Sequence, residues 1–157
     1  MLKRLSLALT VAAVLAGGPA AAQSDYGPAL TLEAARRVAA AAEAEARRTG
    51  DEIAVAVVEP SGQLILFQRM DGTIYAATAL AQAKARSAAD FRQPTLNFQT
   101  AAARNAVILG AVGAVTIEGG VPLIVDGRVV GAVGVSGSSP AHDGRIAKAG
   151  AAALEAR

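Results

Sequence analysis

Residues 119–137 read GGVPLIVDGRVVGAVGVSG, which is two apolar runs on either side of the dipeptide Asp126-Gly127. Both residues of this dipeptide accept the positive φ angles of a two-residue turn, so the stretch predicts an antiparallel hairpin with strands over 121–125 and 128–135. A glycine inside a strand weakens it, because it adds no side chain to the packing. The repeated glycines therefore indicate that another body lies close to this sheet.

Side-chain alternation divides the second strand of this hairpin into two faces. One face carries Val129, Gly131, Val133 and Val135, and the other carries Val130, Ala132, Gly134 and Ser136. The second face narrows to small residues toward its end. Such a flat surface admits a covering helix, a neighbouring subunit or a planar ligand.

The rest of the chain alternates helical and strand patterns. We expect helices over 31–48, 74–91 and from 139 onward, a short helix from 95, and strands over 53–59, 63–69 and 112–118. Strands joined by hairpins favour an antiparallel sheet. The predicted fold class is therefore α+β, with a single-layer antiparallel sheet of about five strands covered by helices.

The N-terminus has the pattern of a secretory signal peptide. Lys3 and Arg4 precede an apolar run over 5–16, and Ala20-Ala21-Ala22 provides a small-residue cleavage site. The run is shorter than the ~18 to 20 residues of a membrane span, so no stable membrane insertion is expected after leader cleavage. The predicted organisation is a signal peptide over 1–22 and a single domain over 23–157, exported to the periplasm or the extracellular medium.

Composition restricts the partners of the mature chain. The formal net charge is +2, and removal of Lys3 and Arg4 with the leader brings it to 0, which gives no support to a nucleic-acid partner. There is no cysteine for a disulfide or a thiolate metal site. Aromatic residues make up only 3% of the chain, and alanine buries little area. We therefore expect a homo-oligomer, in which subunit association supplies part of the stability.

The segment after the glycine-rich hairpin holds the polar candidates. Ser136 lies in Gly134-Val135-Ser136-Gly137-Ser138, which departs from the G-x-S-x-G nucleophile pattern at its last position. Asp143 falls in the first turn of a helix, whose N-terminus attracts a carboxylate or a phosphate. His142 is the only histidine, so it can provide one axial bond to a haem iron or serve as a solvated capping residue.

A second polar group follows the strand over 63–69. Arg69, Met70 and Asp71 end this strand, and Lys84 lies on the next predicted helix. Together they could flank a ligand that carries carboxylates, or they could form surface ion pairs of little energetic value. No two carboxylates show a spacing suited to acid–base catalysis, so we predict no catalytic residue.

Five segments resemble the GlcG/HbpS-like haem-binding family, whose domain also forms the C-terminal part of PduO-type proteins. They are LTLEAARRVAAAAEAEA at 30–46, IAVAVVEPSGQLILFQRMDG at 53–72, AxxKARSAADF at 81–91, the hairpin at 119–137 and HDGRIAKAG at 142–150. The resemblance implies a profilin-like α+β domain that assembles into oligomers, with some members exported and binding haem. Thr73-Ile74 stands where relatives commonly have alanine after Met-Asp-Gly, and the first helix lacks a histidine, so haem would have to use His142 or Met70.

We therefore predict an exported, oligomeric protein that binds a small molecule, with haem as the first candidate and no catalytic activity. The residues expected to contact the ligand are Arg69, Met70, Asp71, Lys84, Gly119, Gly120, Gly134, Ser136, His142 and Asp143. One alternative is an enzyme or enzyme accessory acting on a small oxygenated metabolite, with Arg69, Asp71, Lys84 and Asp143 converging on a pocket. Another is a structural assembly subunit whose flat glycine face is buried against another chain.

Overall fold

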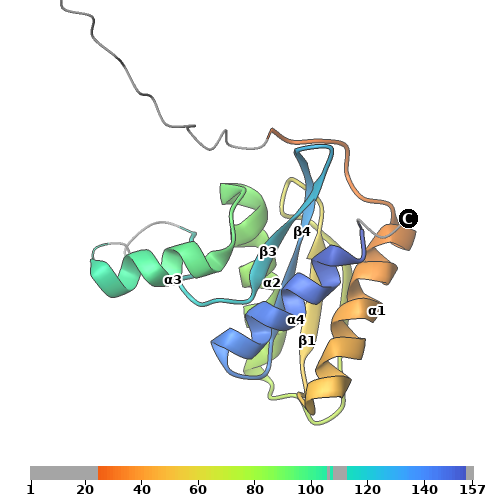
Figure 1. The fold of residues 1–157 in the computed structure, drawn as a ribbon, viewed down its shortest axis with the longest axis vertical. Helices are drawn as coiled ribbons and strands as arrows, with labels where there is room; N and C mark the ends of the chain where they lie inside the picture. Colours follow the sequence, from red (N-terminus) through yellow and green to blue (C-terminus); the bar gives the residue numbers. More distant parts are fainter. Residues whose placement is uncertain (1–24, 106, 108–112, 155–157) are drawn as a thin grey trace, which may run out of the picture.

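The computed structural model describes residues 25–105, 107 and 113–154, and the predicted signal peptide lies outside this range. Its elements follow one another in the order shown in Figure 1. They are α1 (Leu32–Thr49), β1 (Ala54–Val58), β2 (Leu64–Arg69), α2 (Ala76–Phe91), α3 (Thr95–Arg104), β3 (Gly120–Val125), β4 (Arg128–Ser136) and α4 (Pro140–Ala152). Among these residues, no helix is both long and apolar enough to cross a membrane.

The four strands form one antiparallel sheet in the order β2-β1-β4-β3. Asp126 and Gly127 have φ angles of +50° and +74°, as the predicted two-residue turn between β3 and β4 requires. The predicted α+β class with an antiparallel sheet is confirmed. The strand predicted over 112–118 is wrong for residues 113–118, which form no strand, and Val112 lies outside the described residues.

Helices cover both faces of the sheet (Figure 1). Helix α2 packs on one face, whereas α1 and α4 pack against each other and on the opposite face. Each face has its own apolar core. The α1–α4 side is built mainly from Val55, Val57, Val133, Val135 and Ile146, and the α2 side mainly from alanines of α2, β1 and β4.

The small-residue face of β4 is the surface against which α2 packs. A Cβ atom at Gly134 would collide with the backbone of Ala81 and Ala85, and one at Gly120 would collide with the backbone of Lys84. Of the three occupants considered for this face, the covering helix is therefore the one that the structure shows, packed closely on the sheet. The interpretation of this face as a seat for a planar ligand is wrong within one subunit, because α2 fills the space.

A β-bulge changes the face to which one side chain of β4 belongs. Leu123 pairs with Gly131 and Ile124 pairs with Val129, so Val130 is an extra residue without a partner in β3. Its side chain joins the core on the α1–α4 side instead of facing α2, contrary to the prediction from strict alternation. The bulge thereby places Val130 near the start of α1.

Capping residues fix where the two helices beside the site begin and end. Thr31 accepts a hydrogen bond from the backbone N–H of Ala34, and Gly50 ends α1 in a left-handed conformation. Ser139 caps α4, and Pro140 takes its first position. Asp51 directly follows the Gly50 cap, and His142 lies three residues after Ser139, in the first turn of α4.

Candidate ligand-binding site

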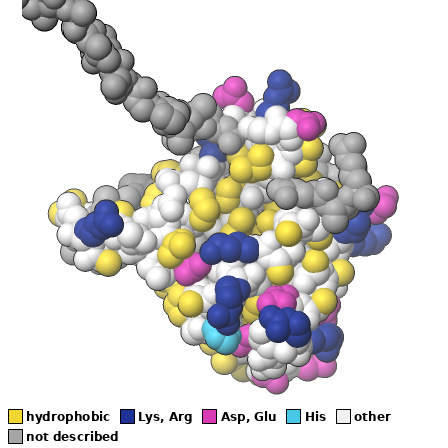
Figure 2. Space-filling model, in the orientation of Figure 1, with side chains coloured by type: hydrophobic (Ala, Val, Ile, Leu, Met, Phe, Trp, Pro, Cys, Tyr) yellow, Lys and Arg dark blue, Asp and Glu magenta, His cyan; other side chains and the backbone are white. Residues whose placement is uncertain are grey.

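One end of the molecule brings together the loop after α1, the loop between β2 and α2, and the loop between β4 and α4. Two adjacent hollows lie there and share Glu52, with volumes of about 240 and 320 Å³. The smaller is lined by Gly50, Asp51, Glu52, Gly72, Thr73, Ile74, Gly137 and Ser138, and the larger by Glu43, Arg47, Glu52, Arg69, Met70 and Asp71. Figure 2 shows charged side chains of both signs gathered at this end.

Asp51 is the hub of the smaller hollow. Its carboxylate accepts hydrogen bonds from the hydroxyls of Ser138, at 2.5 Å, and Thr49, at 2.6 Å, and lies 3.0 Å from Nδ1 of His142. The hydroxyl of Ser138, then that of Thr49, and then His142 lower the pKa of Asp51 to about 2. Asp51 is therefore ionised near neutral pH and acts only as an acceptor.

This ionised carboxylate orients the His142 ring. Because Asp51 can only accept, the proton that joins the two residues sits on Nδ1, and a neutral ring then carries its lone pair on Nε2. The side chain of His142 is 39% exposed, and Nε2 has no hydrogen-bond partner among the described residues. A carboxylate on one ring nitrogen and an open second nitrogen is the arrangement usual for a metal-ligating histidine.

A buried ion pair lies behind these loops. Nζ of Lys84 is 2.7 Å from Oδ2 of Asp143, and the two side chains are only 1% and 2% exposed. The ammonium also donates to the carbonyl of Val135 at 3.0 Å and reaches the hydroxyl of Ser136 at 3.5 Å. Burial raises the pKa of Asp143, although the hydrogen bond and the charge of Lys84 oppose this. The Lys84–Asp143 pair therefore lies in the interior of the protein and has a structural role.

Ser138 connects the buried pair with the surface histidine. Its backbone N–H donates to Oδ1 of Asp143 at 3.0 Å, while its hydroxyl donates to Asp51. The chain of contacts therefore runs from Lys84 through Asp143 and Ser138 to Asp51 and His142. Neither Asp51 nor Ser138 was predicted from the sequence as a site residue, although Asp51 directly follows Gly50, which ends α1.

The larger hollow collects the predicted residues at the end of β2. Arg69 and Asp71 are exposed, whereas Met70 is half-buried and packs against the core on the α1–α4 side. The guanidinium of Arg69 lies 5.4 Å from the ring centre of Tyr75, which is a cation–π distance. Ile74 and Tyr75 are 60% and 87% exposed, so an apolar surface adjoins the two hollows.

The predicted residues thus separate into two groups. Arg69, Met70, Asp71 and His142 lie at the surface of this end. The other group is buried behind this surface and consists of Lys84, Gly119, Gly120, Gly134, Ser136 and Asp143. The pocket of Arg69, Asp71, Lys84 and Asp143 expected for an enzyme does not form in the described chain, because Lys84 and Asp143 neutralise each other in the interior.

Ligand contact by these residues stays a prediction. The described part of the chain holds no group of three or more histidine or acidic side chains arranged to bind a metal ion. What this end offers is one oriented imidazole, an apolar margin and charges of both signs.

Comparisons with known proteins agree on one family. Residues 30–152 match the family model described as "Haem degrading protein HbpS-like". Protein GlcG of Escherichia coli strain K12 is 37% identical over 109 residues, which cover 68% of this chain and 81% of GlcG. The crystal structure of HbpS superposes with a TM-score of 0.76 at 33% identity, covering 82% of this chain and 92% of HbpS.

A crystal structure of a PduOC–haem complex superposes with a TM-score of 0.72 at 25% identity, covering 80% of this chain and 94% of PduOC. The family match spans most of the chain, including the loop that carries Asp51 and the start of α4, which carries His142. This protein therefore belongs to the HbpS-like family, as the resemblance of its sequence segments predicted.

Proposed function

We propose that this chain is an exported, homo-oligomeric protein that binds a small molecule, with haem as the first candidate ligand. The observation that carries the proposal is the His142–Asp51 pair at an open surface. The family description and the haem complex of PduOC support haem over other planar ligands. A leader-like N-terminus supports export, and the alanine-rich core supports association of subunits.

The donor set at this end fits haem. His142 would hold the iron through Nε2, because Asp51 occupies Nδ1 and fixes the orientation of the ring. Ile74 and Tyr75 offer apolar surface for a porphyrin face, and Arg69 offers a cation for a carboxylate. When bound, haem would supply an iron centre for ligand or electron exchange, which the side chains alone lack.

The size of the hollows indicates how such a ligand would lie. At about 240 and 320 Å³ they are at or below the lower end of drug-sized pockets, which span roughly 300–1,000 Å³. A planar molecule as large as haem would therefore lie across this surface and keep one face open in a single subunit. Association of subunits would cover that face, which joins the two parts of the proposal.

Titration of the mature chain, residues 23–157, with haemin tests the proposal. We expect a Soret shift that saturates, and we expect it to be lost or strongly weakened in His142→Ala. Lys148→Ala is the matched control, because it removes an exposed cation from the same helix without touching Asp51. Far-UV circular dichroism verifies folding of each variant. No Soret shift in the wild type, or an unchanged shift in His142→Ala, would overturn the haem assignment.

A further inference from the structure

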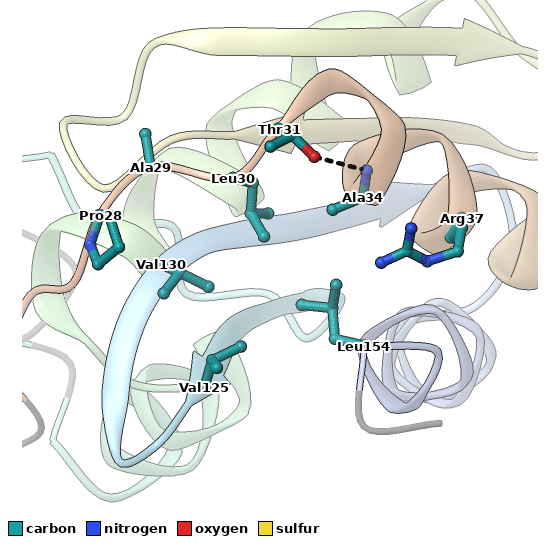
Figure 3. A pocket seen from close by; sticks show the side chains of 9 residues that line it. All are labelled: Pro28, Ala29, Leu30, Thr31, Ala34, Arg37, Val125, Val130 and Leu154. Atoms are coloured by element: carbon teal, nitrogen blue, oxygen red, sulfur yellow. Dashed lines mark hydrogen bonds between the residues drawn. The ribbon is translucent and has the colours of Figure 1, made fainter. Parts of the chain in front are cut away.

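A separate pocket lies at the opposite end of α1. It has a volume of about 410 Å³ and lies between the start of α1, the β3–β4 hairpin and the end of α4 (Figure 3). Its lining consists of Pro28, Ala29, Leu30, Thr31, Ala34, Arg37, Val125, Val130 and Leu154. With its 18 residues, α1 is about 27 Å long, so this pocket is remote from His142.

The walls of this pocket are aliphatic. Leu30, Val125 and Leu154 are half-buried against the core, and Val130 reaches the pocket because of the β-bulge. Thr31 carries the one hydroxyl among the described lining residues, and this hydroxyl already accepts a hydrogen bond from the backbone N–H of Ala34. Figure 2 shows hydrophobic side chains at the surface near the hairpin, with charged side chains of both signs at its tip.

Among the described residues that line the pocket, Arg37 is the one with an ionisable side chain. Figure 3 shows its guanidinium directed from α1 toward Leu154, across the pocket. Its contact with Glu33 is long, at 3.4 Å, and both side chains are exposed, at 52% and 85%, so the pair is weak. A guanidinium has five donors in a fixed fork that matches a carboxylate, which leaves donors for a ligand.

We propose that this pocket binds an amphipathic monocarboxylate, with the alkyl chain against the aliphatic walls and the carboxylate on Arg37. The volume lies within the range of small-molecule pockets, and an apolar lining with one placed polar group is their usual composition. The described lining offers too few polar groups for a sugar or a nucleotide, and the positive charge of Arg37 repels cations. This site is independent of the haem proposal.

Calorimetric titration of the haem-free mature chain with decanoate tests the inference. We expect saturable binding with one site per chain, weakened roughly tenfold to a hundredfold in Arg37→Gln, because a hydrogen bond to a charged group is lost. Arg36→Gln is the matched control, since Arg36 is the exposed neighbour on α1 outside the lining. Glu33→Gln should tighten binding, because it removes the carboxylate that competes for Arg37.

Two further arms separate the contribution of the charge from that of the apolar walls. Decanol should bind more weakly than decanoate and should not respond to Arg37→Gln. Ala29→Phe, at an exposed position of the rim, should block both ligands without enlarging the core. The inference is overturned if decanoate fails to saturate a site, if Arg36→Gln and Arg37→Gln weaken it equally, or if Ala29→Phe leaves binding unchanged.

Discussion

Replacement of Lys84 by methionine is expected to destabilise the fold severely. The change keeps an unbranched side chain, one atom shorter, but removes a charged group that is 1% exposed and lies 2.7 Å from a carboxylate whose side chain is 2% exposed. It also removes the hydrogen bond to the carbonyl of Val135. Breaking a buried pair by removing one partner costs about 3–5 kcal/mol, because the remaining charge is left uncompensated.

Urea unfolding at pH 7 and fixed protein concentration measures this cost. Lys148→Met is the control, because its pair with Glu118 is 3.4 Å long and Lys148 is 54% exposed, so its loss should cost no more than about 1 kcal/mol. The double variant Lys84→Met/Asp143→Leu should recover much of the loss, since an apolar pair replaces both charges. A cost below about 1 kcal/mol for Lys84→Met, or additive costs in the double variant, would refute the reasoning.

The pH dependence of this variant provides a second measurement. Burial raises the pKa of Asp143, and Lys84 is the main influence that opposes the rise. Without Lys84, the folded chain binds a proton at Asp143 more tightly than the unfolded chain does. Acidification then favours the folded state, so the deficit of Lys84→Met should shrink as the pH falls below neutral. A deficit that stays constant with pH would contradict an uncompensated carboxylate.

Three further outcomes are expected. Asp51→Asn should lower the free energy of unfolding by about 1–2 kcal/mol at pH 7. In acid unfolding this difference should shrink below pH 3.8 and be nearly gone at about pH 2, because a carboxyl whose pKa falls from 3.8 to about 2 on folding loses its stabilising contribution across that range. Gly134→Ala should cost about 1–3 kcal/mol in urea unfolding, since the methyl group meets the α2 backbone. Mass spectrometry of the exported protein should find an N-terminus at Gln23, and retention of Met1 would contradict cleavage after Ala22.

Local signals in the sequence predicted most of the fold. Thr31, Gly50, Asp126-Gly127 and Ser139 each act through their own backbone or the next few residues, so their effects can be read without tertiary information. The bulge at Val130 could not be read in this way. It depends on how β3 pairs with β4, and strict alternation assumes that no residue is extra.

The strand predicted over 112–118 failed for a related reason. Its residues have apolar β-type composition, but a strand requires a partner, and residues 113–118 pair with neither edge strand of the described sheet, β2 or β3. Val115 instead donates its backbone N–H to the hydroxyl of Ser87 on α2. A side chain from a distant helix thus takes the hydrogen bond that a neighbouring strand would have used.

The site was only partly predictable, because its decisive contacts join residues far apart in sequence. His142 was identified as the one histidine, but its partner Asp51 lies 91 positions earlier. Lys84 looked like a surface cation, because a buried lysine cannot be recognised without its partner, Asp143, which lies 59 positions away. The sequence shows which side chains are charged or can bind a ligand, whereas only the packing of α2 and α4 on the sheet determines which of them remain exposed.

The glycines of the β3–β4 segment have a consequence beyond close packing. Because Gly134 and Gly120 let α2 lie against the sheet, Lys84 is held beside the end of β4, and Gly119 leaves room for its ammonium. A Cβ at Gly119 would lie 2.8 Å from Nζ of Lys84. The glycine face of β4 is therefore covered by α2 of the same chain. Helix α2 carries Lys84, whose ammonium pairs with Asp143. Since Asp143 and Asp51 both hold Ser138, the orientation of His142 depends on residues of the interior as well as on its own partner at the surface.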